Sequence, residues 1–315
     1  MKILITGAAG NLGSLLTRHL LTSGHELRLL THRRPVPPEI RDHSNVKVYR
    51  ADLARPETLL DPCRGVDAVV HFAGVLFAPR PEKFLPVTNV RWFENLVAAA
   101  LTGGAGKVIL VSFPHVAGPS SPQNPAPETL EGRPDSVHAR TRLAAEKRMF
   151  AACEGTATTP IALQPGMIYG RGVLMIEAAR WLARRRLLAV WPEPTPIHLL
   201  ALPDFNRAVV AAVEKGNARG VYNLGDDAPA TLQEFLDAAT AHWGYRRPWR
   251  FPRWSFHVAG AAVELFAGVF GTRAPLTRDF IRIGMAGYCA DTSRMKAELL
   301  PALEYPALRD GLPLL

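Results

Sequence analysis

Residues 1–13 read MKILITGAAGNLG, and this opening is the most informative part of the chain. An apolar strand pattern over residues 2–6 runs into a T-G-x-x-G-x-x-G turn, after which apolar residues recur at helical spacing. In such a turn, Gly7 makes the tight bend, Gly10 lets the backbone approach a pyrophosphate, and Gly13 lets the helix pack on the strand. The sequence therefore predicts a dinucleotide site, formed by Gly7, Ala9, Gly10, Asn11, Leu12 and Gly13. The alternative is a glycine-rich turn that binds nothing.

The composition indicates a large globular protein. The chain has 315 residues, of which 48% are hydrophobic, so it can bury the core of one large domain or of two unequal ones. Cys63, Cys153 and Cys289 lie far apart and lack the spacing of metal ligands, which favours small buried side chains in a reducing, cytoplasmic setting and no metal site. A strand from residue 2 leaves no room for a signal peptide, and no apolar run is long enough to predict a membrane span.

The charge of the chain bears on its partners. A formal net charge of +9 permits an acidic ligand such as a dinucleotide phosphate. Because the arginines are scattered and no DNA-binding motif accompanies them, nucleic acid is not an expected partner. Residues 243–256 interleave aromatic side chains with arginines. This stretch could hold an aromatic or acidic substrate, but packing with solvated arginines explains it equally well.

Strand and helix patterns alternate from the amino end. Strands are predicted at residues 2–6, 26–31, 46–49, 67–72, 107–112 and 159–164, and helices at 11–23, 89–102 and 136–153. This alternation predicts an α/β fold with a Rossmann-type, doubly wound parallel sheet. We expect residues 1–165 to form the NADP-binding core. Residues 166–315 then form a smaller, mostly helical substrate-binding region that is interleaved with that core.

The second half is less regular. Helices are predicted at residues 175–188, 204–215 and 231–243, the last opening with a capping box, and the long proline-rich loop at 114–134 is of a length often tied to function. Residues 254–270 predict a buried helix or a lid. The basic run Arg184-Arg185-Arg186 is explained better as a solvated helix end than as a phosphate site.

Further motifs follow in order. They are Asp52-Leu53, His71-Phe72-Ala73-Gly74, Asn89 at a helix start, Gln164-Pro165-Gly166-Met167-Ile168-Tyr169-Gly170, Leu202-Pro203-Asp204, Val221-Tyr222-Asn223-Leu224-Gly225 and Asp291-Thr292-Ser293-Arg294. In this order the chain resembles, nearly end to end, the extended short-chain dehydrogenase/reductase family, which includes nucleotide-sugar epimerases, dihydroflavonol reductases and 3β-hydroxysteroid dehydrogenases. Asp52 follows the third strand, where the family's acidic residue meets the adenine. The resemblance implies further cofactor contacts at Leu53, Phe72, Ala73, Gly74, Ser112, Arg142, Pro165, Gly166 and Met167.

The family's catalytic residues are replaced in this chain. Its Ser or Thr lies three residues before a V-Y-G, which here is Val-Ala-Gly at 116–118, so Phe113 takes that position. Its Y-x-x-x-K precedes an L-x-x-E, here at 143–146, so His138 and Arg142 replace the Tyr and the Lys. A shift of one residue would bring in Ser112, but adjacent strand residues point to opposite faces.

The two residues that replace the Tyr and the Lys can still support the reduction of a carbonyl. His138 and Arg142 are four residues apart on one helix face. Arg142 can donate hydrogen bonds to the nicotinamide ribose, and His138 can deliver a proton to a carbonyl that is being reduced. Because Arg142 lowers the pKa of His138, turnover should rise as the pH falls through a pKa at or below about 6.5. The alternative is a pair of surface residues over an inert cleft.

Three other side chains are weighed as candidates. The resemblance places the Tyr169 phenol near the nicotinamide end, which makes it the second choice of proton donor. His115 lies in the loop expected to roof the site, and His71 ends the fourth strand. For both histidines, packing or proximity to the cofactor is favoured over catalysis.

The end of the second strand bears on cofactor choice. A ribose-binding acidic residue is expected there, yet the chain reads Thr31-His32-Arg33-Arg34. Arg33 and Arg34 can pair with a 2′-phosphate, which favours NADP(H) over NAD(H). The alternative is a basic loop that contacts only solvent.

Two classes of function stay open. The favoured one is an NADP-dependent oxidoreductase of a small carbonyl or alcohol compound, because the whole carboxy-terminal substrate region is retained. The other is a catalytically silent NADP(H)-binding sensor or regulator. A nucleotide-sugar epimerase or dehydratase fits less well, since the family's Ser and Tyr carry that oxidation. The expected partner is a small-molecule substrate, and a homodimer is left open.

Overall fold

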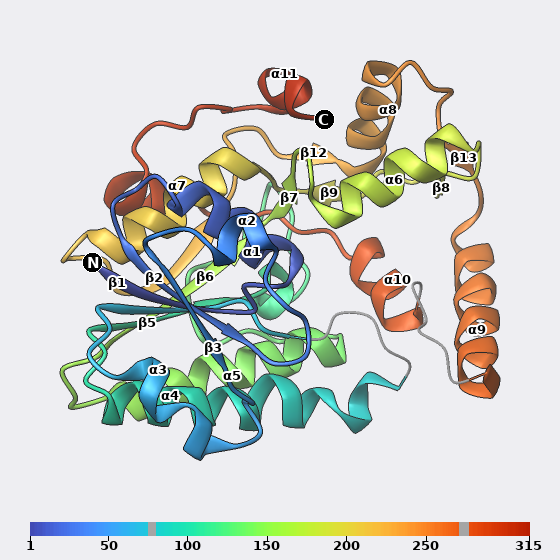
Figure 1. Cartoon of the computed structure of the whole chain (residues 1–315). Coiled ribbons are helices and arrows are strands. Elements are labelled where there is room, and N and C mark those ends of the chain that lie inside the picture. Colours follow the sequence, from blue (N-terminus) through green and yellow to red (C-terminus); the bar gives the residue numbers. More distant parts are fainter. Residues whose placement is uncertain (75–79, 271–276) are drawn as a thin grey trace.

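A seven-stranded parallel sheet forms the centre of the computed structural model, which describes residues 1–74, 80–270 and 277–315 (Figure 1). Its strands are β1 (Lys2–Thr6), β2 (Glu26–Thr31), β3 (Val46–Arg50), β4 (Ala68–His71), β5 (Lys107–Val111), β6 (Thr159–Pro165) and β11 (Gly220–Leu224). They lie in the order β11-β6-β5-β4-β1-β2-β3, and every neighbouring pair is parallel. Because the chain winds outward in both directions from the β1–β4 pair, the prediction of a doubly wound Rossmann-type sheet is confirmed.

Helices cover both faces of the sheet (Figure 1). The helices α1 (Asn11–Leu20) and α7 (Leu202–Glu214) lie on one face, and α3 (Leu60–Cys63), α4 (Trp92–Thr102) and α5 (Val137–Cys153) lie on the other. Alternate residues of β1 serve the two cores, since Ile3 and Ile5 pack in one apolar cluster and Leu4 packs in the other. The short helix α2 is Pro38–Arg41.

The carboxy-terminal half adds three small strand pairs and further helices. The pairs are β7 (Met167–Tyr169) with β10 (Leu199–Ala201), β8 (Ala189–Val190) with β13 (Trp249–Arg250), and β9 (Pro196–Ile197) with β12 (Ala230–Thr231). The helices are α6 (Leu174–Arg184), α8 (Leu232–His242), α9 (Arg253–Phe270), α10 (Arg278–Met285) and α11 (Leu308–Gly311). Because β11 from this half belongs to the main sheet, the chain after residue 165 is interwoven with the part before it.

The six predicted strands agree with the structure to within one residue at each end, but the seventh strand of the sheet, β11, was not predicted as a strand. The helix expected at residues 89–102 instead begins with a π-helical turn, Pro86–Arg91, before α4. The capping box is confirmed, because Thr231 and Glu234 each accept a hydrogen bond from the other's backbone N–H. The loop at 114–134 starts with a 3₁₀ turn and is held by Asn223, which donates to Ala126 and whose backbone N–H donates to Glu128.

Helix α9 departs from its prediction. The sequence predicted a buried helix or a lid. Burial is wrong for the outward face, where Trp254, Val258 and Leu265 are 67%, 60% and 70% exposed. The apolar content of the sequence suggested burial, but the fold leaves this helix at the edge of the molecule (Figure 1). Within the described ranges, no helix is long and apolar enough to cross a membrane. The three cysteines are buried, and the described residues hold no group of side chains suited to a metal ion.

Candidate active site

The glycine turn after β1 has the geometry that its spacing predicts. Gly7 has a φ of +73°, and a Cβ there would lie 2.8 Å from the backbone nitrogen of Ala73. A Cβ on Gly13 would lie 2.4 Å from the carbonyl oxygen of Gly7. The Gly10 N–H donates to that same carbonyl at 2.7 Å, and no side chain caps the start of α1. The first N–H groups of α1 therefore stay available to a phosphate.

Asn11 uses its side chain within the protein. Its Nδ2 donates to the carbonyl of Gly172 at 2.7 Å, and its Oδ1 accepts from the backbone N–H of Leu174 at 2.8 Å. Leu12 packs against the apolar core beside the sheet. The amide of Asn11 is therefore already occupied, which leaves its backbone groups to meet a dinucleotide, while the side chain of Leu12 is partly buried.

The rim beyond β2 carries the basic residues that bear on cofactor choice. Arg33 and Arg34 are exposed, and among the described residues neither forms an ion pair. Arg33 donates from Nε to His32 at 3.2 Å, while His32 lies 3.4 Å from a carboxylate oxygen of Asp52. The Asp52 carboxylate also accepts from the backbone of Ala54, and the neighbouring Leu53 carbonyl accepts from Asn95. Strands β2 and β3 thus bring the two arginines and the predicted adenine contact to one edge.

The end of β4 is tightly packed. His71 is fully buried, with Nδ1 2.7 Å from Thr6 Oγ1 and its ring 4.6 Å from that of Phe93. Burial, with Arg142 as the next cause, holds the His71 pKa well below its usual value. This placement agrees with the favoured packing role. Phe72 meets the Phe205 ring edge-on at 6.1 Å.

Helix α5 brings the replaced catalytic residues together. It begins after Ser136, whose hydroxyl accepts from the Ala139 N–H, and its inner face buries His138, Arg142 and Glu146. This burial excludes the alternative of a surface pair. A Cβ on Gly74 would lie 2.4 Å from Arg142 Nη2, so the guanidinium lies against the backbone that follows β4.

Arg142 and Glu146 form a buried charged region. Burial lowers the pKa of Arg142 to about 10, so the guanidinium stays charged at neutral pH. Burial raises the pKa of Glu146 to about 7, although Ser112 and Gln164 both donate hydrogen bonds to its carboxylate. Ser112 therefore faces α5, and Phe113 also contacts α5 through His138. The expectation that these two residues point to opposite faces is wrong, because both lie beyond the end of β5, where strand alternation no longer applies.

His138 stands in an aromatic setting. Its ring meets that of Phe113 edge-on at 4.8 Å, and Phe113 stacks on His115 at 5.0 Å. Burial first, then the charge of Arg142, lowers the pKa of His138 to about 3. The imidazole is neutral at physiological pH, and an imidazolium acid would form only in strongly acidic solution. His115 is also buried, with its pKa lowered to about 4 by burial and its Nε2 3.3 Å from the Ala286 carbonyl oxygen.

Tyr169 lies away from His138 and Arg142. The side chain is fully buried in the carboxy-terminal core, where its ring contacts Phe235 at 5.8 Å and its hydroxyl lies against Gly311. Burial raises the pKa of this phenol. We therefore do not retain Tyr169 as the second proton donor.

The residues after β6 lie at the same edge of the sheet as His138 and Arg142 of α5. Pro165 ends β6, and the N–H groups of Gly166 and Met167 donate to Leu224 and His198 at 2.8 Å. Strand β5, which ends before Ser112, neighbours β6 in the sheet. In open α/β sheets, ligands bind at the carboxyl ends of the strands, where these residues lie.

Buried polar atoms without a hydrogen-bond partner gather at this edge. Within the described part of the chain they include His71 Nε2, Asn89 Oδ1, His138 Nδ1, Arg142 Nη1 and Gln164 Oε1. Buried polar groups normally find partners, so a cluster without them indicates a place where a bound molecule supplies them. With the open start of α1, these atoms fit a dinucleotide and a polar substrate group.

Sequence reasoning did not assign three residues that the structure places here. Glu146 lies one helical turn beyond Arg142, and this spacing could have revealed it. Gln164 was quoted in a motif without a role. Tyr288, whose ring lies 5.5 Å from that of His115, is too distant in sequence for any local signal to place it.

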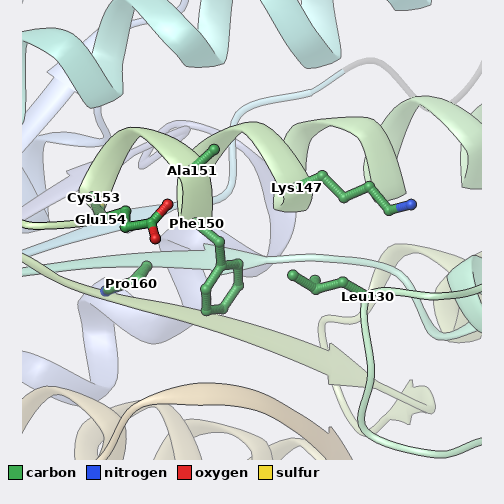
Figure 2. A pocket seen from close by; sticks show the side chains of 7 residues that line it. All are labelled: Leu130, Lys147, Phe150, Ala151, Cys153, Glu154 and Pro160. Atoms are coloured by element: carbon green, nitrogen blue, oxygen red, sulfur yellow. The ribbon is translucent and has the colours of Figure 1, made fainter.

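Two hollows border α5. A groove of about 470 Å³ beside α5 is lined by Leu130, Lys147, Phe150, Ala151, Cys153, Glu154 and Pro160 (Figure 2). Because Pro160 belongs to the amino end of β6, this groove lies at the wrong end of the sheet for the family's chemistry. A cavity of about 30 Å³ lies between His115 and the end of α10.

The chain belongs to the NAD dependent epimerase/dehydratase family, whose model matches residues 3–225. It is 33% identical to the 2-alkyl-3-oxoalkanoate reductase of Stenotrophomonas maltophilia, over 78% of this chain and 77% of that protein. It is 28% identical to the ceramide reductase of Caulobacter vibrioides, over 86% and 80%. The structure of MoeE5 in complex with UDP-glucuronic acid and NAD superposes with a TM-score of 0.78 at 22% identity, covering 100% of this chain and 97% of that one.

These likenesses confirm the resemblance to extended short-chain dehydrogenases/reductases and the prediction of an oxidoreductase. The likeness to MoeE5 bears on the fold alone. The cofactor class is a nicotinamide dinucleotide, as the family description states.

Proposed function

We propose that this protein is an NADP(H)-dependent reductase of carbonyl compounds with apolar substituents. The proposal is carried by the environment of Arg142, whose guanidinium is buried and charged. Among the described residues its Nη1 has no hydrogen-bond partner. It lies beside the aromatic wall formed by Phe113 and His138. A buried cation without its hydrogen bonds is costly, so a ligand that supplies acceptors is strongly favoured there. Ribose hydroxyls are such acceptors.

When bound there, the dinucleotide would supply a hydride for the carbonyl carbon. In the proposed mechanism, Arg142 orients the nicotinamide ribose, and the backbone at Gly10 and the start of α1 binds the pyrophosphate. His138 donates a hydrogen bond to the carbonyl oxygen as a neutral imidazole. As negative charge develops on that oxygen, the ring passes it a proton from one nitrogen and takes a proton from water at the other. The imidazole therefore need not become charged.

The walls of the site support an apolar substrate. Phe113 stands where the family has a hydroxyl, and its ring joins those of His115 and His138. Aromatic rings favour alkyl groups over the hydroxyls of a sugar. The names of the relatives that act on 2-alkyl-3-oxoalkanoate and ceramide agree with this choice. Epimerisation is disfavoured because the Phe113 and His138 positions carry no hydroxyl.

The proposal is tested by NADPH consumption with a series of 3-oxo acids and ketones of increasing alkyl length. We expect turnover that improves as the alkyl group lengthens, because each buried methylene contributes about 0.8 kcal/mol. Consumption that is independent of chain length, or that occurs only with nucleotide sugars, would contradict the apolar substrate.

His138 should govern turnover through hydrogen bonding. With NADPH saturating, His138→Ala is expected to lower kcat about 100-fold, the usual effect of losing a donor to a developing oxyanion. His138→Gln, whose amide can still donate, should recover part of that loss. Between pH 5 and pH 8 the dependence of kcat on pH should have the same shape in the unaltered protein and in His138→Gln. The reason is that the pKa of His138 is about 3, so its ring does not titrate in this range. An imidazolium acid would be favoured instead if both variants were equally inactive and lacked an inflection that the unaltered protein shows.

Cofactor preference should depend on the two exposed arginines after β2. Replacing Arg33 and Arg34 together by alanine is expected to weaken NADPH binding about 10- to 100-fold, because charge-assisted hydrogen bonds to the 2′-phosphate are lost. NADH binding should hardly change. Calorimetry with both cofactors measures the preference, and Arg18→Ala, an exposed arginine on α1, is the control. Tighter NADH binding by the unaltered protein would rule out the preference for NADP(H).

A catalytically silent NADP(H)-binding sensor is the second candidate. It is favoured by the neutral state of His138 and the lack of a hydroxyl at the Phe113 and His138 positions. Tight NADPH binding without turnover of any carbonyl in the series, and with no effect of His138→Ala, would select this function over the reductase.

A further inference from the structure

The outward face of α9 is apolar. Trp254, Val258 and Leu265 are spaced by four and seven residues, so they lie on one side of the helix, and all three are more than half exposed. The opposite side packs on α10, where a Cβ on Gly260 would lie 2.5 Å from Ile281 Cδ1. A helix that faces water normally carries polar residues on its outer side. The outer side of α9 is instead suited to an apolar medium.

Exposed tryptophans continue this surface onto α6 and β13. Trp181 is 51% exposed and has the Arg185 guanidinium 4.0 Å from its ring centre. Trp249 is 57% exposed, and its ring N–H donates to the carbonyl of Arg186 at 2.9 Å. The pairing of β13 with β8 holds this region beside the end of α6, and α9 follows directly, on the same side of the molecule (Figure 1).

The same region is strongly basic. Seven exposed arginines lie at residues 184, 185, 186, 246, 247, 250 and 253. The ion pairs of the described residues provide only two carboxylates to them, Asp237 for Arg247 and Arg250, and Glu193 for Arg253. These seven arginines and their two carboxylate partners together carry a net charge of +5. We call this surface of α6, β13 and α9 the basic aromatic edge.

We propose that the basic aromatic edge docks on an anionic lipid surface. Arginines attract anionic headgroups, tryptophans favour the boundary between headgroups and acyl chains, and the apolar face of α9 can enter that boundary without spanning the bilayer. The charge pattern disfavours a second copy of the chain, since two-fold pairing of this edge would bring like charges together. Nucleic acid would match the arginines but not the stripe of Val258 and Leu265. The inference does not depend on the proposed reductase.

Vesicle sedimentation tests the proposal. With vesicles of equal parts phosphatidylcholine and phosphatidylglycerol, the protein should sediment at low salt, and far less with phosphatidylcholine alone. Arg184→Glu with Arg185→Glu should weaken binding more than tenfold, since each basic residue near an anionic surface contributes about 1 kcal/mol. Trp254→Ser with Leu265→Ser should weaken it similarly, and that loss should persist at high salt.

Controls keep the outcome interpretable. Arg64→Glu with Arg309→Glu changes two exposed arginines elsewhere and should bind vesicles nearly as the unaltered protein does. Thermal unfolding identifies any variant that has lost its fold. Equal binding to neutral and anionic vesicles, or equal losses in the control pair, would overturn the proposal. So would a dimer in solution that the Trp254 and Leu265 variant dissociates, because the edge would then be covered by a second copy.

Discussion

Arg142→Gln is expected to weaken NADPH binding about 10- to 100-fold, because hydrogen bonds from a charged donor contribute roughly 1.5–3 kcal/mol. The guanidinium is buried against Gly74 and should meet the ribose directly. The same change removes a charge that holds down the pKa of His138, so that pKa should rise. Calorimetry measures the first effect, and titration of the His138 ring by NMR measures the second.

Arg140→Gln is the matched control for this prediction. Arg140 lies on the same helix two residues earlier, but it is exposed and donates to the Asp135 carbonyl. Its replacement should leave both the affinity and the His138 titration unchanged. If Arg142→Gln binds NADPH as tightly as the unaltered protein, the guanidinium does not hold the ribose.

Gly13→Ala should disrupt the dinucleotide turn. The added Cβ would lie 2.4 Å from the Gly7 carbonyl oxygen and 2.9 Å from its carbon, and backbone atoms cannot move aside as a flexible side chain can. Overpacking of this kind costs about 1–3 kcal/mol of folding free energy, and displacement of Gly7 should abolish measurable cofactor binding. Denaturant unfolding and calorimetry report the two losses.

Gly216→Ala provides the comparison, because a Cβ there meets no atom within 4 Å. It should leave stability and affinity close to their original values. An unaltered midpoint for Gly13→Ala would mean that α1 can shift on the sheet, contrary to the close packing described above.

Six of the seven strands of the sheet could be predicted because their signals are local. Each central strand is a short apolar run bounded by turn residues, and the glycine turn identifies the first crossover. The π-helical turn before α4 and the exposed position of α9 could not be predicted in this way. Periodicity reports which residues are apolar, but the contacts that bury or expose them come from distant parts of the chain.

The candidate site could likewise be predicted only in part from local patterns. Their spacing placed His138 and Arg142 on one helix face. The resemblance to the family assigned Phe113 to the same site. The spacing also predicted that Arg142 lowers the pKa of His138. Burial lowers that pKa more, and no local pattern reports burial. Tyr169 was misjudged because its motif fixes the backbone position after β6, while packing against Phe235 and Gly311 determines where its side chain points.

The hydrogen bonds of Asn11 join the two halves of the molecule. Asn11 is the first residue of α1, where we propose that the pyrophosphate binds, and its partners Gly172 and Leu174 lie at the start of α6, whose far end carries the arginines. Any event that displaces α6 must strain or break these bonds. Linkage is reciprocal, so a partner that changes the free energy of dinucleotide binding through α6 has its own binding changed by the same factor when the dinucleotide is bound.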